Sequence, residues 1–139
     1  MKTSFVLLTV LFIALIGCAQ QVSEIESPMD EAEEIASYMD VTPAEAKELI
    51  DNNPDLIILD VSPAYDRGHL PGAINHYIGD GSLDRAIPSL DKDAKYLVYC
   101  HVDSASIGGA QKLVDAGFSN VYRLEGNYKA WVDAGYPTE

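Results

Sequence analysis

Residues 96–106 read Tyr-Leu-Val-Tyr-Cys-His-Val-Asp-Ser-Ala-Ser, an apolar run that ends in a cysteine and passes into a polar turn. The run 96–99 is typical of a strand buried on both faces, and an apolar stripe with helical spacing follows over residues 107–114. The sequence therefore places Cys100 at a strand-to-helix turn. Such a turn directs backbone N–H groups and the positive end of a helix dipole towards one point, which favours a thiolate and a bound anion.

Strand and helix patterns alternate along the rest of this part of the chain. The predicted strands are 56–59, 73–75, 96–99 and 121–124, and the helical patterns lie at 43–52, 107–116 and 128–134. This alternation predicts an α/β domain with a parallel sheet covered by helices on both faces. Ligands bind beyond the carboxyl ends of the strands in such sheets, and Cys100 lies at one of those ends. A hydroxyl in place of its thiol would then be hydrated or paired, and the substitution would leave stability nearly unchanged.

The chain begins with a pattern of secretion. Lys2 supplies a positive start, and residues 5–16 are apolar except for one threonine, a stretch that is short for a membrane span and suits a secretory signal. Leu-Ile-Gly-Cys at 15–18 resembles the lipobox of prokaryotic lipoproteins, in which Gly17 admits the signal peptidase and Cys18 receives a diacylglyceryl group. An ordinary cleaved signal with an incidental cysteine and an uncleaved anchor are the alternatives.

These observations divide the chain into three segments. We predict a signal peptide at 1–17, a lipidated acidic tether at 18–37 and one globular domain at 38–139, held on the extracytoplasmic face of a membrane in the cell envelope. The chain has 9 basic and 22 acidic residues, a net charge of −13. Such a surface repels nucleic acid and anionic lipid, so we exclude nucleic-acid binding and expect the lipid on Cys18 to be the membrane attachment.

The chain has two cysteines. If Cys18 carries lipid, Cys100 has no partner for an intramolecular disulfide. A free thiol in a disulfide-permissive compartment indicates that its reactivity is used. The alternative is a small buried apolar residue, because free cysteines are often buried.

Five separated motifs between Val41 and Pro137 resemble those of the rhodanese-like family. They are Leu59-Asp60-Val61, the run Gly68-His69-Leu70-Pro71-Gly72-Ala73, Val98-Tyr99-Cys100, residues 116–121, and Leu124-Glu125-Gly126-Asn127 with Ala130-Trp131. The resemblance implies a five-stranded, mostly parallel α/β sheet flanked by helices on both faces. It also implies sulfur transfer through a persulfide on Cys100, from a small sulfur-containing donor to a thiol, cyanide or protein acceptor. Neither a metal nor an organic cofactor is required.

The residues after Cys100 form the candidate anion-binding loop, with their amides turned towards its sulfur. They are His101, Val102, Asp103, Ser104, Ala105 and Ser106. Ala105 occupies a position where arginine is common in the family, which argues against a related phosphatase because arginine would grip the phosphoryl group. Asp103 and Asn127 each stand where glycine is frequent. We expect the carboxylate of Asp103 to disfavour the thiolate and repel thiosulfate, so that its removal speeds transfer; the alternative is that it holds the loop or His101.

The remaining polar residues have two interpretations each. His101 either lowers the thiol pKa as an imidazolium or faces solvent, and its spacing from Cys100 and Asp103 does not suit a metal site. We interpret His69 as a structural hydrogen bonder and Asp60 as a loop organiser. Ser104 and Ser106 bind an anion or cap a helix. A non-catalytic module that docks a partner protein is the alternative to a sulfurtransferase.

Overall fold

The computed structural model describes residues 37–139, so the predicted leader and Cys18 lie outside the described residues. Within that range the chain forms one sheet of five strands in the order β1-β5-β4-β2-β3, with every pair parallel. The strands are β1 (Met39–Val41), β2 (Ile57–Asp60), β3 (Ile74–Asn75), β4 (Lys95–Tyr99) and β5 (Asn120–Leu124). The helices are α1 (Pro43–Asn52), α2 (Ser82–Ala86), α3 (Asp103–Asp115) and α4 (Asn127–Asp133). The predicted five-stranded α/β fold is confirmed.

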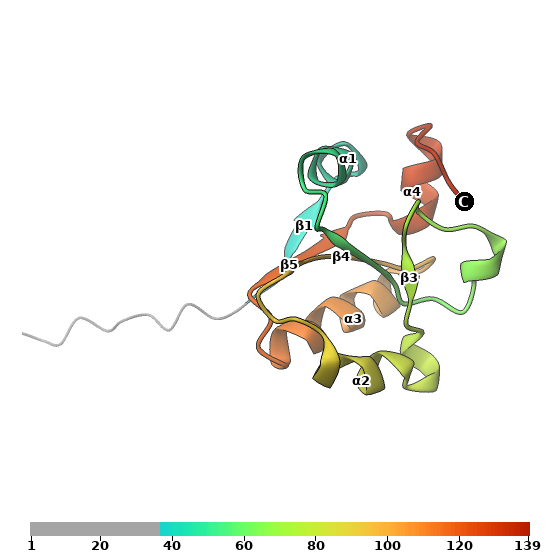
Figure 1. The fold of residues 1–139 in the computed structure, drawn as a ribbon. Coiled ribbons are helices and arrows are strands. Elements are labelled where there is room, and N and C mark those ends of the chain that lie inside the picture. Colours follow the sequence, from blue (N-terminus) through green and yellow to red (C-terminus); the bar gives the residue numbers. More distant parts are fainter. Residues whose placement is uncertain (1–36) are drawn as a thin grey trace, which may run out of the picture. The chain divides into compact units, whose positions relative to one another are not determined.

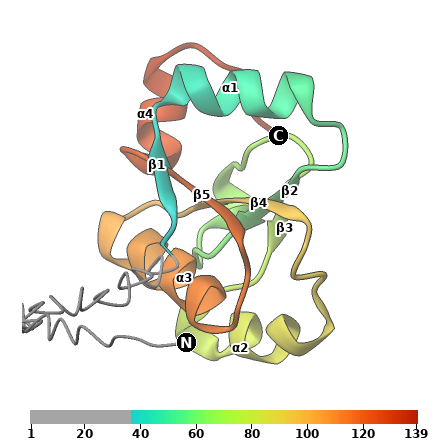
Figure 2. The same cartoon turned by 90° about the vertical axis from the view of Figure 1, so that its left-hand side faces the viewer.

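The helices cover both faces of the sheet, with α1 and α4 on one face and α2 and α3 on the other (Figures 1 and 2). The sheet has one hydrophobic core on each face. Strand β4 contributes to both, because successive side chains of a strand point to opposite faces. Tyr96 and Val98 join the core beneath α2 and α3. Leu97 and Tyr99 join the core beneath α1 and α4, where Trp131 is the largest buried side chain.

The local signals in the sequence account for most of these elements. Thr42 forms a capping box with Glu45, and Pro43 opens α1, as the sequence predicts. Two elements have no such signal: β1 has only three residues, and α2 only five. The helix α3 begins at Asp103, before the apolar stripe that starts at residue 107. Its first turn is mostly polar, so no apolar pattern marks its start.

The parallel arrangement gathers the carboxyl ends of the strands at one edge of the sheet. Asp60 at the end of β2 lies in register with Tyr99 at the end of β4, and Val98 lies in register with Arg123 of β5. The segments that leave these strands therefore meet around Cys100. Within residues 37–139, none of the helices combines the length and the apolar character that a membrane crossing requires.

Adjacent glycines in α3 test how closely this helix packs on the sheet. A Cβ at Gly109 would come within 3.2 Å of Val61 and 3.3 Å of Val98, whereas at Gly108 it would come no closer than 3.4 Å to the end of Ile78. We expect Gly108→Ala to raise the free energy of unfolding by about 1 kcal/mol through helix propensity. Gly109→Ala should gain less or lose stability because two β-branched side chains must move. An equal gain in chemical denaturation of the two variants would contradict this packing.

Candidate active site

Cys100 follows the last residue of β4, and the first turn of α4 holds its backbone. The N–H of Cys100 donates to Oδ1 of Asn127 at 3.0 Å, and its carbonyl accepts from the N–H of Tyr128 at 3.0 Å. The cysteine is only 1% exposed and belongs to the core beneath α3. The residue is closed off from solvent although it ends its strand, so of the two outcomes expected for a hydroxyl here, hydration is removed and pairing remains.

The environment of the Cys100 thiol works in two directions. Burial raises its pKa, while the backbone N–H groups of Val102 and His101 lower it and the charge of Asp60 raises it further. The net pKa is above the ordinary value. The amides of Val102 and His101 thus act in the predicted direction, but desolvation outweighs them, and this argues against the expectation that the turn yields a favoured thiolate.

Asp103 does not face the thiol as an uncompensated charge. Its Oδ1 accepts from Nδ2 of Asn127 at 2.5 Å and lies 3.4 Å from Nη1 of Arg123. The Arg123 side chain is 9% exposed and also bonds Asp40 of β1, with Nε 2.6 Å from Oδ1. Two partners thus bind the carboxylate whose repulsion we expected.

Asn127, Arg123 and Tyr128 were not among the predicted site residues. A signal for Arg123 exists, because it is the one charged residue inside the apolar run 121–124 and a buried charge requires a partner. For Asn127 the sequence indicates only a departure from the glycine that the resemblance leads one to expect. Its contacts depend on how α4 approaches the loop, which no local pattern encodes.

Asp60 lies beside the same loop and is fully buried. Its Oδ1 accepts from the N–H of Ser62 at 2.7 Å, and its Oδ2 has no hydrogen-bond partner within the described residues. These are contacts of a loop organiser. Burial raises the pKa of Tyr99, and the charge of Asp60 adds to this effect. The Tyr99 hydroxyl accepts from the N–H of Leu70, which ties β4 to the segment after β2.

The two histidines of the site each stack on a tyrosine. The ring of His101 lies 4.5 Å from that of Tyr128, and the ring of His69 lies 3.8 Å from that of Tyr65. His69 also pairs through its backbone with Glu139, the contacts of a structural residue. The stacked His101 is half-buried, so it is not the freely solvated side chain of one alternative.

The remaining loop residues do not supply a cap or a cation. The N-cap of α3 is Val102, which has no side-chain cap bond and is 57% exposed. Ser106 is buried and donates to the carbonyl of Asp103 at 3.0 Å, so its hydroxyl serves the helix backbone. Ser104 is exposed and Ala105 packs against the core. Among residues 37–139, no three His, Cys, Asp or Glu side chains are grouped as metal ligands would be.

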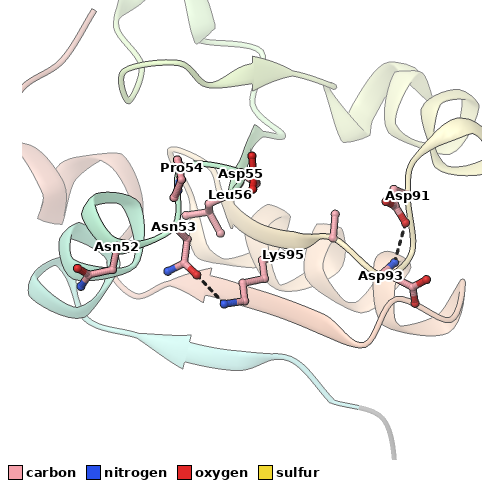
Figure 3. A pocket seen from close by; sticks show the side chains of 9 residues that line it. Asn52, Asn53, Pro54, Asp55, Leu56, Asp91, Asp93 and Lys95 are labelled. Atoms are coloured by element: carbon pink, nitrogen blue, oxygen red, sulfur yellow. Dashed lines mark hydrogen bonds between the residues drawn. The ribbon is translucent and has the colours of Figure 1, made fainter.

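A hollow of about 410 Å³ lies elsewhere, at the amino ends of β2 and β4 (Figure 3). It is lined by Asp55, Asp91 and Asp93, with Lys95 bonded to Asn53. Because this is the opposite edge of the sheet from Cys100, the hollow takes no part in the chemistry of the thiol.

Comparisons with known proteins bear on the same region. The family model described as "Rhodanese-like domain" matches residues 42–134. The thiosulfate sulfurtransferase GlpE of Coxiella burnetii is 33% identical over 73% of this chain and 92% of that protein, and GlpE of Pseudomonas fluorescens is 29% identical over 76% and 94%. The solution structure of the rhodanese-like domain of the Alr3790 protein from Anabaena sp. has a TM-score of 0.65 and 34% identity, covering 72% of this chain and 77% of that one.

The balance around the thiol predicts a pH dependence. Since only the thiolate is alkylated and burial raises the Cys100 pKa, the rate of reaction with iodoacetamide should rise with pH along a curve displaced to higher pH than in denaturant. The Cys18→Ala chain leaves Cys100 as the sole thiol, and Cys18→Ala with Cys100→Ser is the blank. A native midpoint at or below the denatured one would contradict the dominance of burial.

Proposed function

The chain belongs to the rhodanese-like domain family, and from this premise we propose that it is a lipid-anchored sulfurtransferase on the extracytoplasmic face of the cell envelope. Its relatives named thiosulfate sulfurtransferase support the reaction class. The lipobox-like run 15–18 supports the anchor and the location. The observation that carries the proposal is a free thiol at the end of β4 with two backbone amides directed at it.

The reaction requires one nucleophile and one leaving group in each half. The Cys100 thiolate attacks the outer sulfur of a donor such as thiosulfate, a sulfur–sulfur bond forms, and the donor's own sulfur–sulfur bond breaks to release sulfite. The resulting Cys100 persulfide is then attacked at its outer sulfur by a thiolate or cyanide, and the Cys100 thiolate leaves. No electron is gained or lost overall. The N–H groups of His101 and Val102 stabilise the anionic sulfur at each stage.

A second function has its own support. The Cys100 thiol is 1% exposed and its pKa is raised, and the loop lacks a cation at Ala105. These features suit a module that docks a partner protein without chemistry. Sulfur transfer is favoured because the amides of His101 and Val102 stabilise the anionic form of the sulfur and because relatives are named thiosulfate sulfurtransferase.

Sulfur loading separates these two functions. Incubation with thiosulfate, polysulfide or glutathione persulfide should add one sulfur atom to Cys100, measured as intact mass, and Cys100→Ser should take up none. We expect Cys100→Ser to cost about 1–3 kcal/mol of stability because a hydroxyl replaces a buried thiol. Circular dichroism serves as the folding control. No mass gain from any donor would favour the docking module, and a gain in Cys100→Ser would point to another nucleophile.

The anchor is tested by a single substitution. Cys18→Ala should move the protein from the membrane fraction to the supernatant of detergent-free lysates, because the acidic surface gives no electrostatic attachment. Sulfur loading of the released protein at Cys100 should equal that of the wild type. Continued sedimentation of Cys18→Ala with membranes would contradict lipidation.

A further inference from the structure

Asn127 occupies a conformation that asparagine tolerates and most residues avoid. Its φ is +58°, the one positive φ of a non-glycine residue in residues 37–139, and its side chain is buried, with the residue 2% exposed. Both ends of its amide are bonded. Oδ1 accepts from the N–H of Cys100 at 3.0 Å, and Nδ2 donates to Oδ1 of Asp103 at 2.5 Å. One side chain therefore connects Cys100, which precedes the loop, with Asp103 within it.

Cys100 and Asp103 together determine which way this amide faces, because the N–H of Cys100 only donates and needs Oδ1 opposite it. An ionised carboxylate only accepts hydrogen bonds, so Nδ2 of Asn127 must face Asp103 and Oδ1 must face Cys100. Arg123 fixes the carboxylate in turn, at 3.4 Å, and its guanidinium is anchored on Asp40 at 2.6 Å. The Asp103 side chain is 66% exposed, so its ion pair with Arg123 contributes little to stability. We therefore assign Asp103 a role in orienting the Asn127 amide.

Resting on the proposed sulfur transfer, we propose that Asn127 is a positioning residue for Cys100 and that Asp103, held by Arg123, holds its amide in the orientation that accepts from the Cys100 N–H. Asp103 and Asn127 contact each other directly, so the two residues act as a donor–acceptor pair. This replaces the expectation that the Asp103 carboxylate only hinders the reaction.

The consequence for chemistry follows from the backbone. The bond from Asn127 and the bond from the Tyr128 N–H fix both polar groups of Cys100, so the amides of His101 and Val102 stay directed at the sulfur. A donor sulfur has to approach along the line that these groups define. A displacement of about 1 Å can cost up to a hundredfold in rate, so a positioning contact outside the reacting atoms has a measurable effect.

Asn127→Gly tests the contact without changing charge. Glycine adopts φ +58° without strain, so the loss of stability should reflect only the two lost side-chain bonds, about 1–3 kcal/mol, and the variant should remain folded. The saturating rate of persulfide formation should fall about tenfold, the size expected for one net hydrogen bond, with the half-saturating donor concentration changed less than about twofold. Hydrogen exchange of the Cys100 amide, followed by NMR, should accelerate.

A matched control is available at the other end of the sheet. Asn120 bonds the carbonyl of Asp93 at 3.2 Å through Nδ2, near the amino end of β5. Asn120→Ala removes this bond and the bond from Nδ2 to Oγ of Ser119 at 3.4 Å, both far from the thiol, and should leave the saturating rate unchanged. An equal fall in rate for Asn120→Ala and Asn127→Gly would overturn the positioning role.

An exchange of the two polar groups tests the orientation argument. Asn127→Asp opposes two carboxylates and should lower the saturating rate at least about tenfold, whereas Asp103→Asn retains an acceptor and should change it less than about threefold. Asp103→Asn added to Asn127→Asp restores a donor opposite an acceptor and should recover at least about fivefold. If Asp103→Asn instead acts by the same factor in both backgrounds, the residues are independent and the proposal is overturned.

The measurements separate failure of this inference from failure of the proposed function. If hydrogen exchange of the Cys100 amide is unchanged in Asn127→Gly, the hydrogen bond between Cys100 and Asn127 is overturned. If exchange is faster but the saturating rate is unchanged, the positioning role of Asn127 is overturned. The rate is measured with whichever of thiosulfate, polysulfide and glutathione persulfide loads the wild type. If none loads it, sulfur transfer is overturned and with it the positioning role, while amide exchange still decides whether the contact exists.

Discussion

Two hydrogen bonds on the backbone of Cys100 join the central strand of the sheet to the last helix. They come from Asn127 and Tyr128, and they require the chain to enter α4 through two consecutive left-handed residues, Gly126 and Asn127. Gly126 has a φ of +67°, and a Cβ there would lie 2.6 Å from that of Ala130. A segment 27 residues further along the chain thus shapes the loop that carries the thiol. The site exists only in the folded domain, where α4 packs through Trp131 on the sheet.

The electrostatics of the site depend on one buried cation in a strongly acidic chain. Arg123 lies between Asp40 and Asp103, so its charge is already shared by two carboxylates. Attraction for an anionic sulfur must therefore come from the backbone amides of His101 and Val102. Burial opposes these amides, and its larger effect explains why a turn that the sequence associates with a thiolate gives the Cys100 thiol a raised pKa.

The sequence predicted the features that depend on neighbours in the chain. The apolar runs located β2, β4 and β5, the Thr42 capping signal located α1, and the order of motifs identified the family and the position of Cys100. It did not predict that Asp103 would be compensated or that Asn127 would hold the nucleophile, because these contacts join residues at least 20 positions apart. It also missed β1, whose three residues carry no periodicity and pair only because β5 offers a free edge.

The pairing of Arg123 with two carboxylates also bears on the choice between sulfur transfer and phosphoryl transfer. A phosphoryl group needs a guanidinium with free donors that bind two of its oxygens side by side. Arg123 directs Nε to Asp40 and Nη1 to Asp103 and is 9% exposed, so it does not replace the arginine that is absent at Ala105. Transfer of a sulfane sulfur has a smaller requirement, since only one terminal sulfur atom has to reach the thiol. A cysteine bordered by the backbone amides of His101 and Val102 satisfies that requirement without a guanidinium.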